Sequence, residues 1–164
     1  MQRELQGWRS IHGPGPDGAI DSDERVTAAR PVVERSEAGA RSLGERYWQE
    51  VSRASRGLAR GCTTTDGLEL RVLGRGPSLL RFGGPELLSD REVVSCGYPI
   101  LGGLLARRAG GAISLSQTAG DEPELRAAVT GFVPRLGGLY RIQRRAHVAI
   151  SRRYFRRLIH EAPS

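Results

Sequence analysis

Residues 139–160 have the sequence LYRIQRRAHVAISRRYFRRLIH, which contains neither glycine nor proline. As an α-helix this stretch would be about 33 Å long. Apolar side chains recur on one side of such a helix at the spacing that favours burial. They are Ile142, Ala146, Ala149, Ile150, Tyr154 and Leu158. The pattern predicts a long C-terminal helix with one apolar face, which needs a β-sheet or another helix to cover it.

The opposite side of this helix is strongly basic. Residues 139–164 contain seven arginines and one acid, Glu161, and thus carry almost all of the chain's net charge of +7. Arg141, Arg145, Arg152 and Arg156 form a stripe. We interpret the stripe as a candidate anion-binding surface for nucleic acid, anionic lipid or an acidic protein. The alternative is a solvated face that pairs with acids elsewhere in the chain.

The middle of the chain has the two-residue period of β-strands. Leu68, Leu70 and Val72 alternate with Glu69 and Arg71, which is typical of a strand with one buried face. Roughly six to eight such segments follow one another up to residue 133, and the turns between them leave no room for a crossover helix. We therefore expect an antiparallel meander, and its paired glycines favour strong bends.

The N-terminal part divides into a tail and a short helix. Residues 13–18 are rich in glycine and proline and an acidic run follows them, so we expect residues 1–41 to be a disordered tail. Ser42 and Glu45 have the spacing of a capping box. Tyr47 and Val51 then recur at helical spacing. We therefore expect a single α+β domain over residues 42–164 that begins with a short helix.

The predicted fold class is α+β: a curved antiparallel meander, half-barrel or barrel-like, with a short N-terminal helix and a long C-terminal helix packed on the sheet. The order of a helix, a meander and a terminal helix resembles that of helix-grip lipid-binding proteins. It is also similar to the order in lipocalin-like β-barrels, which gives a closed barrel as the alternative fold. The resemblance rests on element order alone and no sequence motif accompanies it.

A curved sheet covered by a helix often encloses a cavity, and this suggests a function. We expect a non-catalytic binding domain that holds a small apolar ligand between the sheet and the C-terminal helix. The alternative function is a charge-driven module that docks an anionic partner through the arginine stripe. The structural alternative is that the candidate ligand residues only fill the core. These candidates are Phe82, Tyr98, Phe132, Tyr140, His147 and Tyr154.

Signals for catalysis, metals and cofactors are weak. The absence of lysine excludes a P-loop, and there is no G-x-S-x-G elbow. The histidines and the two cysteines are scattered without a metal-ligand spacing. We therefore predict no catalytic residue, no metal site and no cofactor. An enzyme that uses His147 in the cavity stays as a third hypothesis.

The sequence also bears on location. The first residues contain no apolar run like that of a signal peptide. No stretch approaches the ~20 apolar residues that a membrane-spanning helix needs. We therefore expect a soluble, cytoplasmic protein with no transmembrane segment.

Overall fold

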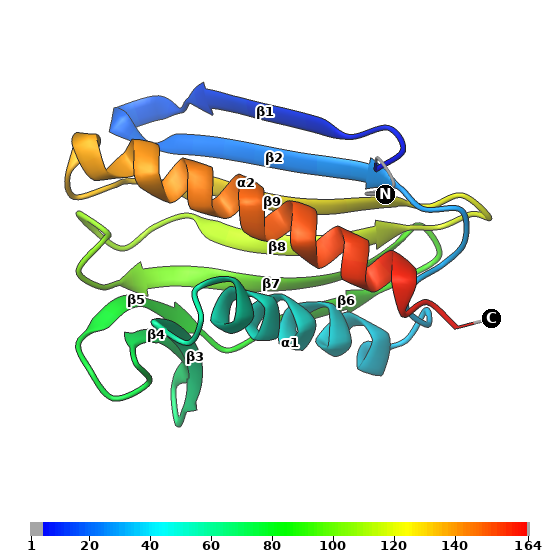
Figure 1. Cartoon of the computed structure of the whole chain (residues 1–164), viewed down its shortest axis with the longest axis horizontal. Helices are drawn as coiled ribbons and strands as arrows, with labels where there is room; N and C mark the ends of the chain where they lie inside the picture. Colours follow the sequence, from blue (N-terminus) through cyan, green and yellow to red (C-terminus); the bar gives the residue numbers. More distant parts are fainter. Residues whose placement is uncertain (1–4, 164) are drawn as a thin grey trace.

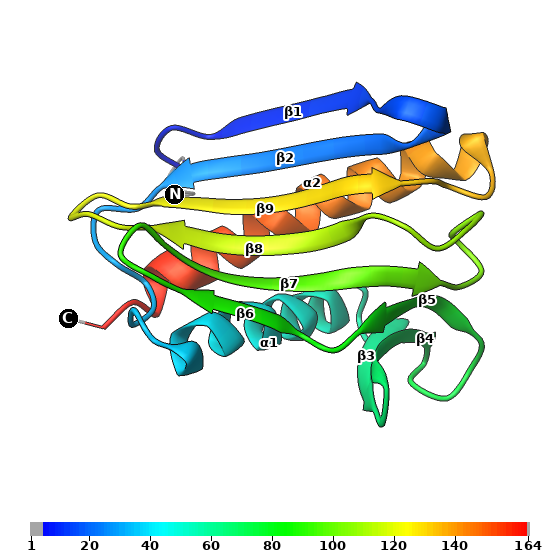
Figure 2. The same cartoon turned by 180° about the vertical axis from the view of Figure 1, so that it is seen from behind.

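The computed structural model describes residues 5–163, which form an antiparallel sheet with two α-helices on one of its faces (Figures 1 and 2). The strands are β1 (Arg9–Pro14), β2 (Ile20–Thr27), β3 (Ala59–Thr64), β4 (Gly67–Val72), β5 (Ser78–Gly83), β6 (Glu86–Ser89), β7 (Val93–Gly102), β8 (Ala112–Thr118) and β9 (Glu124–Phe132). The helices are α1 (Glu37–Ala54), α2 (Gly137–His160) and a short 3₁₀ turn at Pro16–Gly18. The predicted α+β class is thus confirmed.

The sheet is open. Its strand order is β1-β2-β9-β8-β7-β5-β4-β3, and β6 pairs with β7 beside this path. Because no pairing joins β1 to β3 within the described chain, the sheet does not close. The alternative of a lipocalin-like barrel is therefore wrong. Both helices lie on the same side of the sheet, so Figure 2 looks onto a sheet face that no helix covers.

The prediction of a disordered tail over residues 1–41 is wrong for its described part. β1 and β2 form a hairpin, and β2 then pairs with β9 from Val26↔Leu125 to Ser22↔Val129. Of the glycines and prolines that suggested disorder, Gly13 and Pro14 end β1, and Gly15, Pro16 and Gly18 lie in the turn between the two strands. The side chains of β2 that face the helices include Ser22 and Glu24, and these polar residues hide the strand's alternation. Residues 1–4 lie outside the described residues.

The first helix begins earlier than the sequence predicts. The hydroxyl of Ser36 accepts a hydrogen bond from the Gly39 amide at 3.0 Å and caps α1. Ser42 therefore lies inside the helix rather than at its start. The cap is thus a different serine, Ser36, which directly precedes Glu37, the first residue of α1. Gly57, three residues after the end of α1, has a φ of 80°, which lies in the left-handed region that favours glycine.

The C-terminal helix forms over the predicted stretch and packs across the sheet (Figure 1). Its buried face is rotated from the predicted one. Ile142 is 64% exposed, and Ala146 and Ala149 are also exposed. Tyr154 and Leu158 of the predicted face are buried, and Ser151 and Phe155 are buried beside them.

Polar contacts join α2 to α1 and set this rotation. The carboxylate of Glu50, which is 1% exposed, accepts hydrogen bonds from Arg153 Nε at 2.7 Å and from Arg157 Nε at 3.0 Å. The hydroxyl of Tyr154 donates to the Leu43 carbonyl oxygen at 3.0 Å.

Neither helix in residues 5–163 has the length and apolar character needed to cross a membrane.

Candidate functional site

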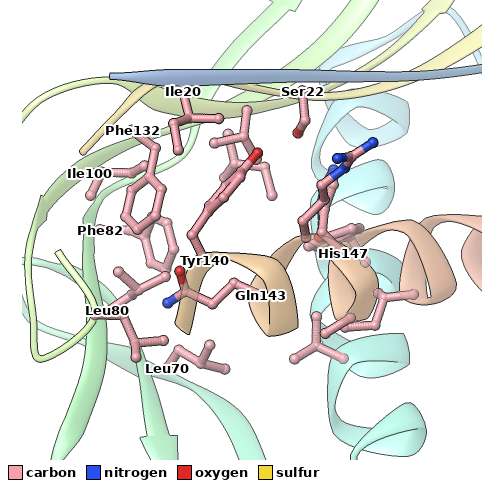
Figure 3. A pocket seen from close by; sticks show the side chains of 18 of the residues that line it. Ile20, Ser22, Leu70, Leu80, Phe82, Ile100, Phe132, Tyr140, Gln143 and His147 are labelled. Carbon is pink, nitrogen blue, oxygen red and sulfur yellow. Dashed lines mark hydrogen bonds between the residues drawn. The ribbon is translucent and has the colours of Figure 1, made fainter. Parts of the chain in front are cut away.

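The sheet, α1 and the first half of α2 surround a cavity of about 200 Å³. Figure 3 shows that strand side chains face α2 across this space, with Phe82 and Phe132 beside Tyr140. The lining is almost wholly aliphatic and aromatic. Its apolar members include Ile20, Val51, Leu70, Leu80, Phe82, Ile100, Ile113, Val129 and Phe132. The polar exceptions are Ser22, Tyr47, Gln143, Arg144 and the two histidines His12 and His147.

The structure brings four of the six predicted ligand residues to this cavity. Phe82, Phe132, Tyr140 and His147 line it. Tyr98 does not, because it is buried against α1, with its ring 5.5 Å from the Trp48 ring between centroids. Tyr154 does not either, because it lies nearly two turns beyond His147 on α2. Phe82 on β5 and Phe132 on β9 both face the helix side of the sheet.

Sequence reasoning missed the wall that β1 and β2 supply. His12, Ile20 and Ser22 line the cavity, yet all three fall in the segment predicted to be disordered. A weak signal was present, since Ser22, Glu24 and Val26 alternate with charged residues. It was obscured because two of these three inward-facing residues are polar. Tyr47 and Trp48 of α1 were also assigned only to packing.

A buried carboxyl group lies beside the cavity on β2. Glu24 is completely buried, and its Oε1 lies 2.9 Å from His12 Nε2. Neither carboxyl oxygen has an aligned hydrogen-bond partner in the described chain. Burial raises the pKa of Glu24 and lowers that of His12. Loss of hydration therefore favours the uncharged form of each group.

His147 contributes a second imidazole from α2. Its Nδ1 lies 3.1 Å from the hydroxyl of Tyr47. Burial lowers the pKa of His147 to about 4, and His12 adds to this effect, so the ring is neutral at pH 7. Three buried atoms around it have no hydrogen-bond partner within residues 5–163: His147 Nε2, His12 Nδ1 and Gln143 Oε1. Buried polar atoms are normally paired, so a group of unpaired ones suggests a missing ligand or water.

An arginine groove runs along the exposed side of α2 next to β1. We define it by Ser10, His12, Val148, Ala149 and six arginines, Arg141, Arg144, Arg145, Arg152, Arg153 and Arg156, which line one hollow. It contains all four arginines of the predicted stripe. Five of its six arginines form no ion pair with an acid of the described chain, whereas the sixth, Arg153, binds Glu50 together with Arg157. Arg152 instead lies over the ring of Trp8, 4.8 Å from its centroid.

The described residues offer no metal centre, because no group of three or more His, Cys, Asp or Glu side chains is arranged to hold an ion. Comparison of the chain with protein-family models, with curated proteins and with solved structures gave no match. The functional argument therefore rests on the cavity and the arginine groove themselves.

Proposed function

We propose that this protein is a binding domain that holds a small, mainly apolar molecule between its sheet and α2. The observation that carries the proposal is the cavity of about 200 Å³ with its nearly continuous apolar lining. An apolar cavity of roughly 150 Å³ stays dry and takes up a benzene molecule. The space here is thus suited to one ring or a short chain.

The arrangement of polar atoms supports the same proposal. Ligand pockets are mostly apolar, with a few polar groups that orient the ligand. Here His147 Nε2, His12 Nδ1 and Gln143 Oε1 lack partners, and all three residues line the cavity. A core that only needed filling would pair such atoms or replace them with apolar ones. Their persistence favours a ligand with at least one hydrogen-bonding group.

The direct test uses N-phenyl-1-naphthylamine, a neutral dye whose fluorescence rises in an apolar environment. The wild-type protein should bind it saturably. Val129→Phe places a ring in the cavity and should weaken binding by at least about tenfold, which corresponds to 1.4 kcal/mol. The milder Val129→Met serves if the Phe variant does not fold.

The matched control is Val93→Phe. Val93 lies on a strand of the same sheet but does not line the cavity. Its variant should therefore bind the dye as the wild type does. Equal loss of binding in both variants, or no saturable binding by the wild type, would contradict the proposal.

The arginine groove supports a second proposal, that the protein binds an anion. The specific observation is that six arginines line one hollow and that five of them, all but Arg153, have no ion-pair partner in the described chain. Arginine donates two parallel hydrogen bonds to a carboxylate or phosphate, so such a row suits an anionic group. Changing these arginines should weaken the binding of such an anion. It should also make the binding less dependent on salt concentration.

A further inference from the structure

We infer that the cavity and the arginine groove bind one molecule, an amphipathic anion with a carboxylate or phosphate joined to a small apolar chain or ring. The inference rests on the proposed apolar-ligand function and extends it to the polar end of the ligand. The apolar part would occupy the cavity, and the anionic group would lie in the groove.

The two hollows share part of their walls. His12 of β1 and Arg144 of α2 line both the cavity and the arginine groove. The nearly buried side chain of His12 and the exposed Arg144 therefore mark the place where the apolar space meets the basic surface. A ligand that passes this junction contacts apolar side chains on one side and guanidinium groups on the other.

The charges at this junction favour an anion. Arg144 and its neighbours Arg141 and Arg145 have no acid within ion-pair distance in the described chain, and each side chain is exposed. Glu24 is the acid beneath the junction, but it is completely buried against His12. Burial raises its pKa and so favours its uncharged form. An entering carboxylate therefore meets three exposed guanidinium groups, while the acid beneath the junction is completely buried.

The same geometry favours a small molecule over a nucleic acid. A nucleic-acid strand needs exposed aromatic rings for its bases, and Trp8, the ring next to the groove, is covered by Arg152 and packs edge-on against Phe155. A phosphate polymer also has no apolar part to place in the cavity. An amphipathic anion uses both hollows.

The experiment compares octanoate with octan-1-ol by titration calorimetry. The two probes have the same chain length and differ in charge. Octanoate should bind at least about tenfold more tightly than octan-1-ol at low salt, and this advantage should shrink as salt is added. The double variant Arg144→Gln/Arg145→Gln should lose the advantage while its affinity for octan-1-ol changes less than about threefold.

The matched control is Arg75→Gln/Arg91→Gln, which removes two exposed arginines outside the groove and should leave both affinities unchanged. Equal affinities for the two probes, or an octanoate advantage that survives in Arg144→Gln/Arg145→Gln, overturn the inference. Binding of octan-1-ol would then still support the apolar-ligand function. If the wild-type protein bound neither octan-1-ol nor the dye, the apolar-ligand function would be contradicted as well.

Binding to phosphatidylglycerol vesicles is a second experiment. Arginine-dependent binding to vesicles without octanoate binding would assign the groove to a lipid surface and would also overturn the inference.

Discussion

At the scale of single residues, Glu24 is an acidic side chain that lies wholly out of water. It is completely buried, and its Oε1 lies 2.9 Å from His12 Nε2. Because burial raises its pKa, the folded protein retains a proton that the unfolded chain has already released. Below the usual glutamate pKa, Glu24 therefore makes its full contribution to the free energy of unfolding. This contribution falls as pH rises from that value through the folded-state pKa.

Glu24→Gln tests this sign. Glutamine keeps the shape of the protonated acid and does not ionise, so the variant should gain stability relative to wild type as pH rises. The slope of the difference should be at most about 1.4 kcal/mol per pH unit. Urea unfolding between pH 5 and 9 measures it, with the exposed Glu86→Gln as control. Parallel curves for wild type and Glu24→Gln would show that Glu24 is not held in its neutral form.

His147 gives the opposite dependence. Burial lowers its pKa to about 4, so the unfolded chain binds a proton at pH 5 that the folded protein does not. Stability should therefore fall as pH drops from about 6.5 to about 4, by up to ~3 kcal/mol. His147→Gln should remove this loss, whereas His160→Gln at the exposed end of α2 should keep it. Unfolding midpoints in urea across this range provide the measurement, and an unchanged acid slope in His147→Gln would contradict the assignment.

The sequence predicts single site residues only where the period of an element is clear. Tyr140 and His147 were placed on the predicted C-terminal helix, whereas Phe82 and Phe132 lay in predicted strands whose faces were not assigned. Tyr98 faces the same side of the sheet but lies under α1, and no pattern shows which inward residue a helix will cover. His12 acquires its environment from β2 and α2, so its neighbours cannot be read from adjacent residues.

At the scale of elements, the close packing of α1 on the sheet depends on Gly44. A Cβ at this position would lie 2.3 Å from Tyr98 Oη and 2.7 Å from Cys96 Sγ. Both of these side chains are buried and have little room to move. Gly44→Ala should therefore lower the free energy of unfolding by about 1–3 kcal/mol in spite of alanine's higher helix propensity.

Gly138→Ala in the first turn of α2 is the matched control. A Cβ there meets nothing within 4 Å, so the variant should be neutral or gain up to ~1 kcal/mol. Thermal and urea unfolding of both variants measure the difference. A Gly44→Ala protein as stable as Gly138→Ala would mean that α1 does not sit as closely on β7 as the structure shows.

Element prediction succeeded where turn residues separate apolar strands and failed at the N-terminus. The segments that became β4 to β9 have alternating or apolar residues between glycine-rich turns. β2 instead has the sequence IDSDERVT. Its charges are satisfied across the open face of the sheet, where Asp23 accepts hydrogen bonds from Arg25 and Arg126. Burial opposes ionisation of Asp23, but these guanidinium groups outweigh it and lower its pKa to about 2. Contacts of this kind between β2 and β9 cannot be predicted from a short stretch of the sequence.

At the scale of the whole molecule, the pairing of β2 with β9 creates the site. It places the N-terminal hairpin beside the last strand, and α2 then returns over that edge of the sheet (Figure 1). The two ends of the chain thus supply the two walls of the junction, His12 from β1 and Arg144 from α2. Sequence periodicity predicts the helix and the strands, but it does not predict this long-range pairing, which places β1 beside the exposed arginine stripe.

The central claim is that the space between the sheet and α2 holds an apolar ligand. Its most direct test is an isotope-filtered NOE spectrum of the methyl-labelled protein with unlabelled octan-1-ol. We predict NOEs from the octyl chain to the methyl groups of Leu80, Ile113 and Val129, which line the cavity. NOEs confined to exposed methyl groups such as those of Leu104 and Ile142, or none at saturating octan-1-ol, would contradict the claim.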